Sequence, residues 1–244
     1  MEFFSTEGRR NETIMFEGGA DTLRYFSKNR RKLGDTWEYA HKKITYVYNE
    51  YGFRTYKFKD VDWSKSIVMF GDSYAAGSSL AIEDTIATKL EKNLNVPVIN
   101  LGLSGSAVDI ACWNSLILHK HYPRPLGIVH IWAPWNRYTN FYNGRAQTFQ
   151  PHDKKFISGV NWEQRSHLYI ENERYIWGDE VPRYECSFFN PEFDSFDKDA
   201  LKAHAFRVEG IDWMDRIDLA RDLTHAGSKS AELAANIIAE KLDL

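Results

Sequence analysis

Short apolar runs alternate with stretches of helical periodicity throughout the part of the chain that follows Ser66. The apolar runs are short, and the first of them, Ile67–Phe70, ends at a glycine, as buried parallel strands often do. The stretches between them place apolar residues on one helical face. Strands are therefore expected at Ile67–Phe70, Pro97–Leu101 and Gly127–Trp132, and helices at Glu83–Leu94, Ala107–Leu118 and Ser228–Leu244.

This alternation predicts an α/β fold, because parallel strands need crossover helices that cover both faces of the sheet. We expect a three-layer α/β/α sandwich with a mostly parallel sheet of about five strands, of the flavodoxin-like kind, over residues 63–244. The stretch from Tyr138 to about Ala205 has no clean periodicity. It must contain the remaining elements of the sheet together with loops.

Residues 1–62 differ from the rest because they are rich in charge and tyrosine. Within them, Ile44–Tyr48 is β-branched and aromatic, and Asn49–Gly52 has the composition of a turn. The aromatic run Phe53–Phe58 follows closely enough to predict a hairpin with the first run. We interpret the segment as an N-terminal extension packed on the edge of the main domain.

Composition narrows the possible partners of this 244-residue chain. Its net charge of −3 lacks the basic excess that binding to phosphate backbones needs, so nucleic acid is not an expected partner. No stretch approaches the roughly 18 apolar residues of a membrane span, and Met1–Phe4 does not lead into a signal peptide. With Cys112 and Cys186 interpreted as free thiols of a reducing compartment, a cytoplasmic location is the default expectation.

Polar clusters follow each of the expected strands. In open parallel sheets, ligands bind beyond the carboxyl ends of the strands, so these clusters are expected to share one rim. The segment before the last helix can reach the same rim. The clusters are Gly71-Asp72-Ser73, Asn100–Gly105 and Ala133–Asn136, and the segment is Asp222–His225.

Together these segments offer a serine, a histidine and an aspartate. A serine hydroxyl is a weak nucleophile that needs an adjacent base, and the base needs a third group to orient it. In isolation, Gly71-Asp72-Ser73 fits a turn or a helix N-cap, and Asp222 with His225 fits a surface ion pair. Their common position at the rim favours the catalytic interpretation.

The chain resembles the SGNH hydrolases, also called the GDSL esterase and lipase family, over residues 66 to about 240. The matching blocks are Phe70–Ser73, Asn100–Gly105 and Asp222–His225, in the order of the family. The third block departs from the family's Gly-x-Asn-Asp, since this chain has Pro134-Trp135-Asn136-Arg137. The departure leaves Asn136 as the least secure member of the site.

The resemblance implies that Ser73 is the nucleophile, His225 the general base and Asp222 the group that orients the imidazole. It also implies an oxyanion hole formed by the backbone N–H groups of Ser73 and Gly105 and the side-chain amide of Asn136. No metal or organic cofactor is implied.

Other residues near these blocks have competing interpretations. Aromatic residues surround Asn136, and Trp135 and Tyr138 are candidate substrate-binding residues. Ser104 lies in a sequence that resembles a nucleophile elbow but lacks its second glycine, so it is set aside. His119 and His121 have a spacing that can chelate a metal, but no partner cluster completes the ligand set. They are expected to be solvated loop residues.

We favour an ester hydrolase that acts through an acyl-serine intermediate on small acyl esters, particularly acetyl esters, and possibly on those of carbohydrates. A carbohydrate O-acyltransferase would use the same acyl-enzyme. A binding module that has kept the fold and lost catalysis is the third possibility, which the altered third block would permit. The sequence leaves the substrate and the oligomeric state open.

Overall fold

A five-stranded sheet with the strand order β4-β3-β5-β8-β9 forms the centre of the molecule. The computed structural model describes residues 3–5, 7–135, 137–142, 145–149, 162–189, 208–242 and 244. All neighbouring strands of the sheet run parallel, as the sequence pattern predicts. The strands are β3 (Ile67–Gly71), β4 (Val98–Asn100), β5 (Gly127–Ile131), β8 (Arg183–Ser187) and β9 (Asp212–Trp213).

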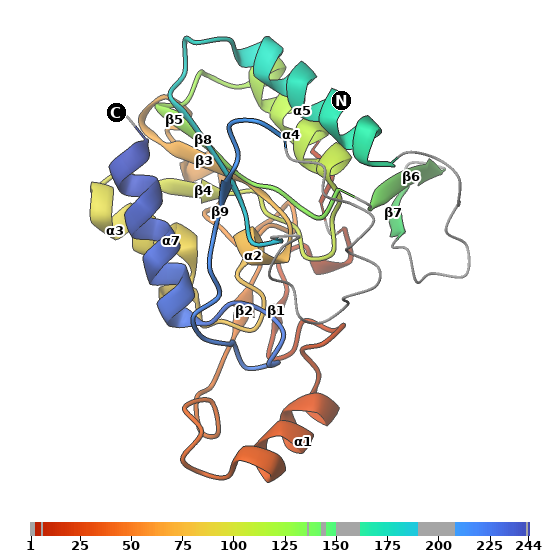
Figure 1. The fold of residues 1–244 in the computed structure, drawn as a ribbon, viewed down its shortest axis with the longest axis vertical. Helices are drawn as coiled ribbons and strands as arrows, with labels where there is room; N and C mark the ends of the chain where they lie inside the picture. The colour runs from red at the N-terminus through yellow and green to blue at the C-terminus, as the bar shows by residue number, and fades with distance from the viewer. Residues whose placement is uncertain are drawn as a thin grey trace.

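Helices cover both faces of this sheet, which gives the expected three layers (Figure 1). Helices α3 (Ile86–Leu94) and α7 (Ser228–Lys241) pack together on one face, and α4 (Val108–His121) and α5 (Trp162–Trp177) pack together on the other. The expected helices are therefore confirmed, with ends that differ by a few residues. The short helix α2 (Ser73–Ala76) follows β3 directly.

The alternation of side chains along β3 explains why its sequence is apolar at every position. Ile67 and Met69 belong to the core cluster beneath α3 and α7. Val68 and Phe70 belong to the cluster beneath α4 and α5. Successive side chains of a strand point to opposite faces, so a strand covered on both faces has no polar position.

The predicted hairpin of the N-terminal segment is wrong. β2 (Tyr46–Val47) pairs antiparallel with β1 (Thr13–Ile14), and the chain after the turn forms no strand with it. The turn itself is present, because the Asn49 side chain accepts hydrogen bonds from the N–H groups of Tyr51 and Phe53. Phe53 then enters an aromatic core cluster, which takes the chain away from β2.

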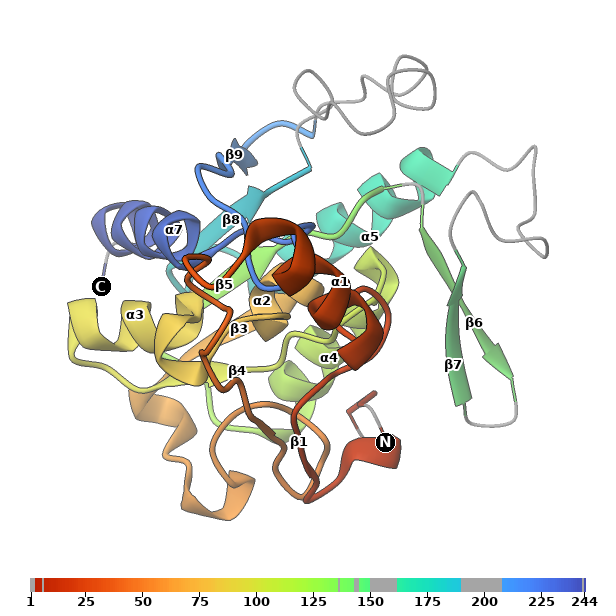
Figure 2. The same cartoon turned by 90° about the horizontal axis from the view of Figure 1, so that it is seen from below.

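The rest of the N-terminal segment contains short helices and one longer helix. Helix α1 (Leu23–Leu33) has no buried residue, and Figures 1 and 2 show it below the sheet, on the same side as α2. The 3-10 helices are η1 (Glu7–Arg9), η2 (Phe58–Asp60), η3 (Trp63–Lys65) and η4 (Ile82–Asp84), of which the last precedes α3 in the main domain.

The stretch without clear periodicity contains elements that the sequence pattern did not predict. β6 (Tyr138–Tyr142) and β7 (Arg145–Phe149) form an antiparallel hairpin of their own, separate from the central sheet. Helix α5 and strand β8 follow, so this stretch supplies one of the helices that cover the sheet and one strand of the sheet. Figure 2 shows the hairpin projecting from the body of the molecule.

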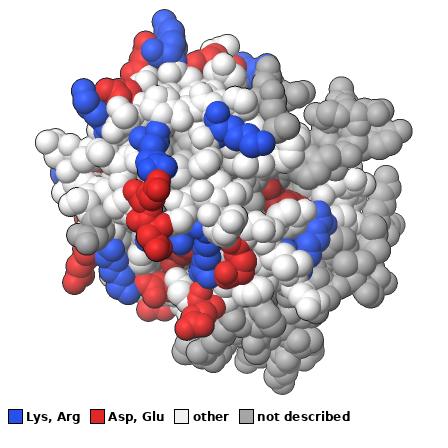
Figure 3. Space-filling view, turned by 90° about the horizontal axis from the view of Figure 1, so that it is seen from above, with Lys and Arg blue, Asp and Glu red and all other residues white. Residues whose placement is uncertain are grey.

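The described surface carries charges of both signs. On the face drawn in Figure 3, the described Lys and Arg side chains lie among Asp and Glu side chains and form no continuous basic stripe. Among the described helices, none combines the length and the apolar character needed to cross a membrane. Cys112 and Cys186 are both free, as expected.

Candidate active site

The junction between β3 and α2 exposes Ser73 at the end of the sheet. Gly71 has φ of +152°, and a Cβ at this position would lie 2.3 Å from the carbonyl oxygen of Ile131, so only glycine fits. Asp72 caps α2 by accepting a hydrogen bond of 3.0 Å from the N–H of Tyr74. The steric limit and the cap together turn the chain sharply at Ser73.

The loop after β4 packs against this junction. The Asn100 side chain donates to the carbonyl oxygen of Ala75 at 2.7 Å and accepts from the N–H of Gly102 at 2.9 Å. A Cβ on Gly102 would lie 2.6 Å from the Cβ of Ala75, so this glycine allows the loop to approach α2. Gly105 has φ of +76°, a backbone conformation that favours glycine.

The loop before α7 holds the aspartate and the histidine. Asp222 Oδ1 accepts hydrogen bonds from the N–H groups of Thr224 at 2.9 Å and His225 at 3.0 Å. Leu223 has φ of +62°, which completes the tight turn between the two functional side chains. The carboxylate therefore shapes the loop that carries its own partner.

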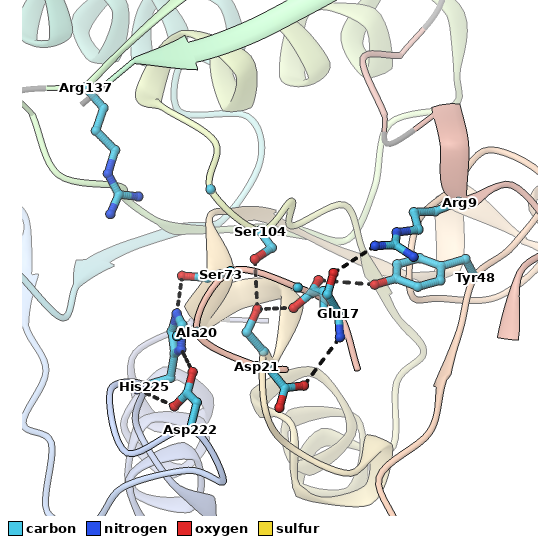
Figure 4. A pocket seen from close by; sticks show the side chains of 14 residues that line it. Arg9, Glu17, Ala20, Asp21, Tyr48, Ser73, Ser104, Arg137, Asp222 and His225 are labelled. Carbon is cyan, nitrogen blue, oxygen red and sulfur yellow. Dashed lines mark hydrogen bonds and ion pairs between the residues drawn. The ribbon is translucent and has the colours of Figure 1, made fainter. Parts of the chain in front are cut away.

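Three side chains from these loops form one hydrogen-bonded chain (Figure 4). His225 Nε2 lies 2.9 Å from Ser73 Oγ, and His225 Nδ1 lies 2.5 Å from Asp222 Oδ2. The serine and the histidine are 152 residues apart in the sequence, and the fold brings them together at one rim. A serine hydroxyl, an imidazole and a carboxylate linked in this order match the geometry of a serine-histidine-aspartate triad.

The electrostatics of the chain favour an ionised aspartate beside a basic imidazole. Burial opposes the charge of Asp222, but the hydrogen bonds and charge of His225 outweigh burial and hold the pKa of Asp222 below its usual range. Burial likewise opposes the charge of His225. The Asp222 carboxylate outweighs this effect, so the pKa of His225 is raised above 6.5.

The altered third block places a cation beside this junction. In the sequence, Arg137 stands where the SGNH pattern has an aspartate. Its guanidinium lies 3.3 Å from Asp72 Oδ2. Burial raises the pKa of Asp72, and the charge of Arg137 acts in the opposite direction. Asn136 lies outside the described residues, so its place in the oxyanion hole stays a prediction.

Comparison with known proteins finds likeness in structure only: no protein-family profile matches the chain, and no curated protein matches it. A member of the lipolytic protein G-D-S-L family from Veillonella parvula DSM 2008 is 14% identical with a TM-score of 0.46, and the match covers 72% of this chain and 96% of that protein.

Two carbohydrate esterases are also similar. The acetyl xylan esterase Est2A from the rumen bacterium Butyrivibrio proteoclasticus is 13% identical with a TM-score of 0.44, over 74% of this chain and 63% of that one. A carbohydrate esterase family 2 enzyme with a carbohydrate binding domain, from Corynascus thermopiles (Myceliophthora fergusii), is 10% identical with a TM-score of 0.46, over 73% of this chain and 65% of that one. The chain thus spans less than two thirds of each.

A pocket of about 420 Å³ opens in front of Ser73, and the N-terminal segment supplies part of its lining. Sequence analysis missed this contribution, because no motif in residues 1–62 indicates chemistry. Figure 4 shows Ser73, His225 and Asp222 on one side of the pocket and Arg9, Glu17 and Tyr48 on the other. The N-terminal lining consists of Arg9, Glu17, Gly18, Gly19, Ala20, Asp21 and Tyr48.

The remaining candidates from the sequence lie in different places. Gly105 and Ser104 both line the pocket, whereas Trp135 and Tyr138 are absent from its lining. Trp135 is 8% exposed and Tyr138 is 4% exposed, and each packs against another aromatic ring. A role for these two in substrate binding stays a prediction. His119 lies on α4 and packs against Trp177 rather than in a loop.

Proposed function

We propose that this chain is a serine esterase that hydrolyses small acyl esters, in particular acetyl esters, through an acyl-serine intermediate. The observation that supports the proposal most strongly is the continuous hydrogen-bonded chain from Ser73 through His225 to Asp222. A lone serine or a lone surface ion pair would not need this geometry. The pocket in front of the serine gives an ester access to it.

In the proposed reaction, His225 Nε2 accepts the hydroxyl proton while Ser73 Oγ bonds to the carbonyl carbon of the ester. The tetrahedral intermediate then expels the alcohol oxygen, which takes the proton from His225. Water, activated by the same imidazole, attacks the acyl-serine, releases the acid and restores the hydroxyl. Asp222 keeps Nδ1 of His225 protonated and stabilises the imidazolium that forms in each half of the reaction.

The proposed oxyanion hole consists of the N–H groups of Ser73 and Gly105 and the side-chain amide of Asn136. The positive φ of Gly105 suits this role, because the loop can present its N–H at the edge of the pocket. Preorganised donors of this kind stabilise the charge that develops on the former carbonyl oxygen. They act only when the tetrahedral intermediate forms.

The decisive experiment is Ser73→Ala, measured by hydrolysis of 4-nitrophenyl acetate and by labelling with a serine-reactive fluorophosphonate. Loss of the triad serine should lower kcat by about 10⁶-fold and abolish labelling. Ser64→Ala, at an exposed position outside the pocket, is the matched control and should behave like the unmodified protein. Equal turnover by the Ser73 variant, with its fold intact by circular dichroism, would remove Ser73 from the mechanism.

The same assays separate the alternatives. If the acyl group passes to an added sugar acceptor faster than to water, by analysis of the products, the protein is an acyltransferase. If the unmodified protein neither hydrolyses the aryl ester nor reacts with the fluorophosphonate, it is a binding module on this fold. Each result would replace hydrolysis as the function of the site.

A further inference from the structure

The pocket wall opposite His225 is centred on Glu17, a carboxylate that the N-terminal segment supplies (Figure 4). Glu17 Oε1 accepts a hydrogen bond of 3.1 Å from the Tyr48 hydroxyl, and Oε2 accepts one of 2.6 Å from the Ser78 hydroxyl. Tyr48 and Ser78 are both buried, so they hold the carboxylate in a fixed position. Arg9 fixes the backbone by donating to the carbonyl oxygen of Glu17 at 2.8 Å.

The positions of the hydroxyl protons decide what this wall can bind. Ser78 has one hydroxyl proton and lies 2.6 Å from Glu17 and 3.0 Å from the Ser104 hydroxyl. Ser78 directs its proton mainly to the carboxylate, at the shorter distance, and Ser104 is the acceptor of the longer contact. Tyr48 donates to Glu17 as well. The protons of Tyr48 and Ser78 therefore point within the wall.

The Glu17 carboxylate leaves acceptor positions of this wall open to a ligand. A carboxylate offers about four lone-pair positions, of which Tyr48 and Ser78 use two. Ser104, which is exposed at the pocket, accepts from Ser78 and keeps a further lone pair and its own hydroxyl proton for a ligand. A ligand that fits this surface must bring several hydrogen-bond donors.

We propose that the wall formed by Glu17, Tyr48, Ser78 and Ser104 binds the alcohol half of the ester, and that this alcohol is a polyhydroxylated ring, that is, a carbohydrate. Two neighbouring hydroxyl groups of a sugar can each donate to an oxygen of the same carboxylate. Glu17 is then the residue that determines specificity for the alcohol. This inference rests on the proposed ester hydrolysis, since it assigns the leaving group of that reaction.

The position of the wall agrees with the side on which the alcohol must leave. His225 delivers the proton to the departing oxygen, so the alcohol lies beside the imidazole. Glu17 and His225 line the same pocket, so an alcohol that leaves beside the imidazole can also contact the wall.

The test compares two esters of one sugar, a methyl glucoside with a single acetyl ester and the same glucoside with every hydroxyl acetylated. The second ester has the ring and the scissile bond but no hydroxyl donors. Glu17→Gln should lower kcat/KM for the mono-acetylated sugar about 10–100-fold, mainly through KM, because it loses a charged acceptor. It should change kcat/KM for the fully acetylated sugar and for 4-nitrophenyl acetate less than threefold.

The matched control is Glu12→Gln, which removes a carboxylate from the same segment at a position outside the pocket lining. It should leave kcat/KM for all three substrates unchanged. Equal losses on the three substrates in the Glu17 variant would show that Glu17 supports the fold or the catalytic residues. An unchanged kcat/KM for every substrate in the Glu17 variant would show that Glu17 does not bind the alcohol. Both results would overturn the inference.

A binding measurement keeps this test separate from the test of hydrolysis. Titration calorimetry of the mono-acetylated glucoside is performed on Ser73→Ala and on the double variant Ser73→Ala/Glu17→Gln. We expect binding to the first and about 10–100-fold weaker binding to the second. If the sugar binds in this way but the unmodified protein does not turn it over, the proposed hydrolysis is wrong and the sugar-binding role of the wall is retained. Absence of binding to Ser73→Ala would overturn the proposed role of the wall in sugar binding.

Discussion

The two sides of the pocket are held in place in different ways. On the catalytic side, Asp222 organises the turn that carries His225 through hydrogen bonds two and three residues away, so a short motif contains its own geometry. On the opposite side, Glu17 depends on Tyr48, 31 residues away, and on Ser78, 61 residues away. The turn between Asp222 and His225 is thus encoded locally, whereas the wall, like the contact between Ser73 and His225, depends on long-range contacts.

A buried ion pair joins the two sides. Arg221, adjacent to Asp222, donates through Nε and Nη2 to the two carboxylate oxygens of Asp21 at 3.0 and 2.7 Å. Asp21 also accepts from the Tyr46 hydroxyl at 2.5 Å, and Asn29 of α1 donates to the carbonyl oxygen of Arg221 at 3.3 Å. The N-terminal segment and the catalytic loop are therefore held together directly beside the triad.

The largest expected effect in the local half of this comparison comes from Asp222→Asn. An amide cannot accept the Nδ1 proton in the same way, so it favours the wrong tautomer of His225 and should lower kcat for 4-nitrophenyl acetate about 10⁴-fold. The loop also loses a charge that stabilises the imidazolium. Asp218→Asn, in the same loop region but outside the pocket lining, serves as the control. A loss below tenfold would show that the orienting carboxylate is not required.

The connection between the two sides is tested by Arg221→Met. Arg221 is 2% exposed and Asp21 is 4% exposed, so the variant leaves a buried carboxylate without its cation. Removal of one partner from a buried pair typically destabilises a protein by about 3–5 kcal/mol, which chemical unfolding would measure.

The matched control for this pair is Arg30→Met. Arg30 pairs with Asp35 on the surface, where the side chains are 44% and 74% exposed, and such pairs contribute about 0–1 kcal/mol. If both arginine variants are equally stable, the N-terminal segment is not held by Arg221. The two sides of the pocket would then be independent.

Asn136→Ala tests the part of the site that departs from the family pattern. If the side-chain amide donates to the oxyanion, its removal should lower kcat about 10²–10³-fold with little change in KM. Steady-state kinetics with 4-nitrophenyl acetate measure this loss. A change below threefold would assign the third donor elsewhere, and Arg137, which lines the pocket beside Asp72, is the next residue to replace.

The sequence predicted the central sheet and the triad segments because both depend on local patterns. β3 is buried at every position, so its apolar run was unambiguous, and Gly71 and Gly102 mark close approaches of the backbone that no other residue permits. The N-terminal segment gave no such signal. Tyr46 pairs with a strand more than 30 residues earlier rather than with the neighbouring run, and strand propensity alone does not select a partner.

The wall could not be predicted for a related reason. Glu17 lies in a polar stretch where a carboxylate is expected on any solvated surface, and its function depends on Tyr48 and Ser78. A signal was present only in Ser78 and Ser104, two serines near the ends of neighbouring strands. Ser104 was considered as a nucleophile and set aside, but its place in the wall required the fold.

The smallest expected effect is a change in pH dependence, and it tests whether the wall acts on the catalytic side. Activity needs neutral His225 as the base, so kcat/KM should rise with pH through the pKa of His225, which lies above 6.5 because Asp222 outweighs burial. Asp72 and Glu17 also favour the protonated form. Glu17→Gln removes one of these charges, so the acidic limb of the profile should move to lower pH with 4-nitrophenyl acetate as substrate.

This shift has a defined sign because a carboxylate stabilises the imidazolium more than the imidazole. Glu12→Gln serves as the control, since Glu12 is not among the charges that raise the pKa of His225. An acidic limb that stays in place would show that the two sides of the pocket interact only through the substrate. A limb that moves to higher pH would contradict a stabilising effect of the Glu17 charge on the imidazolium.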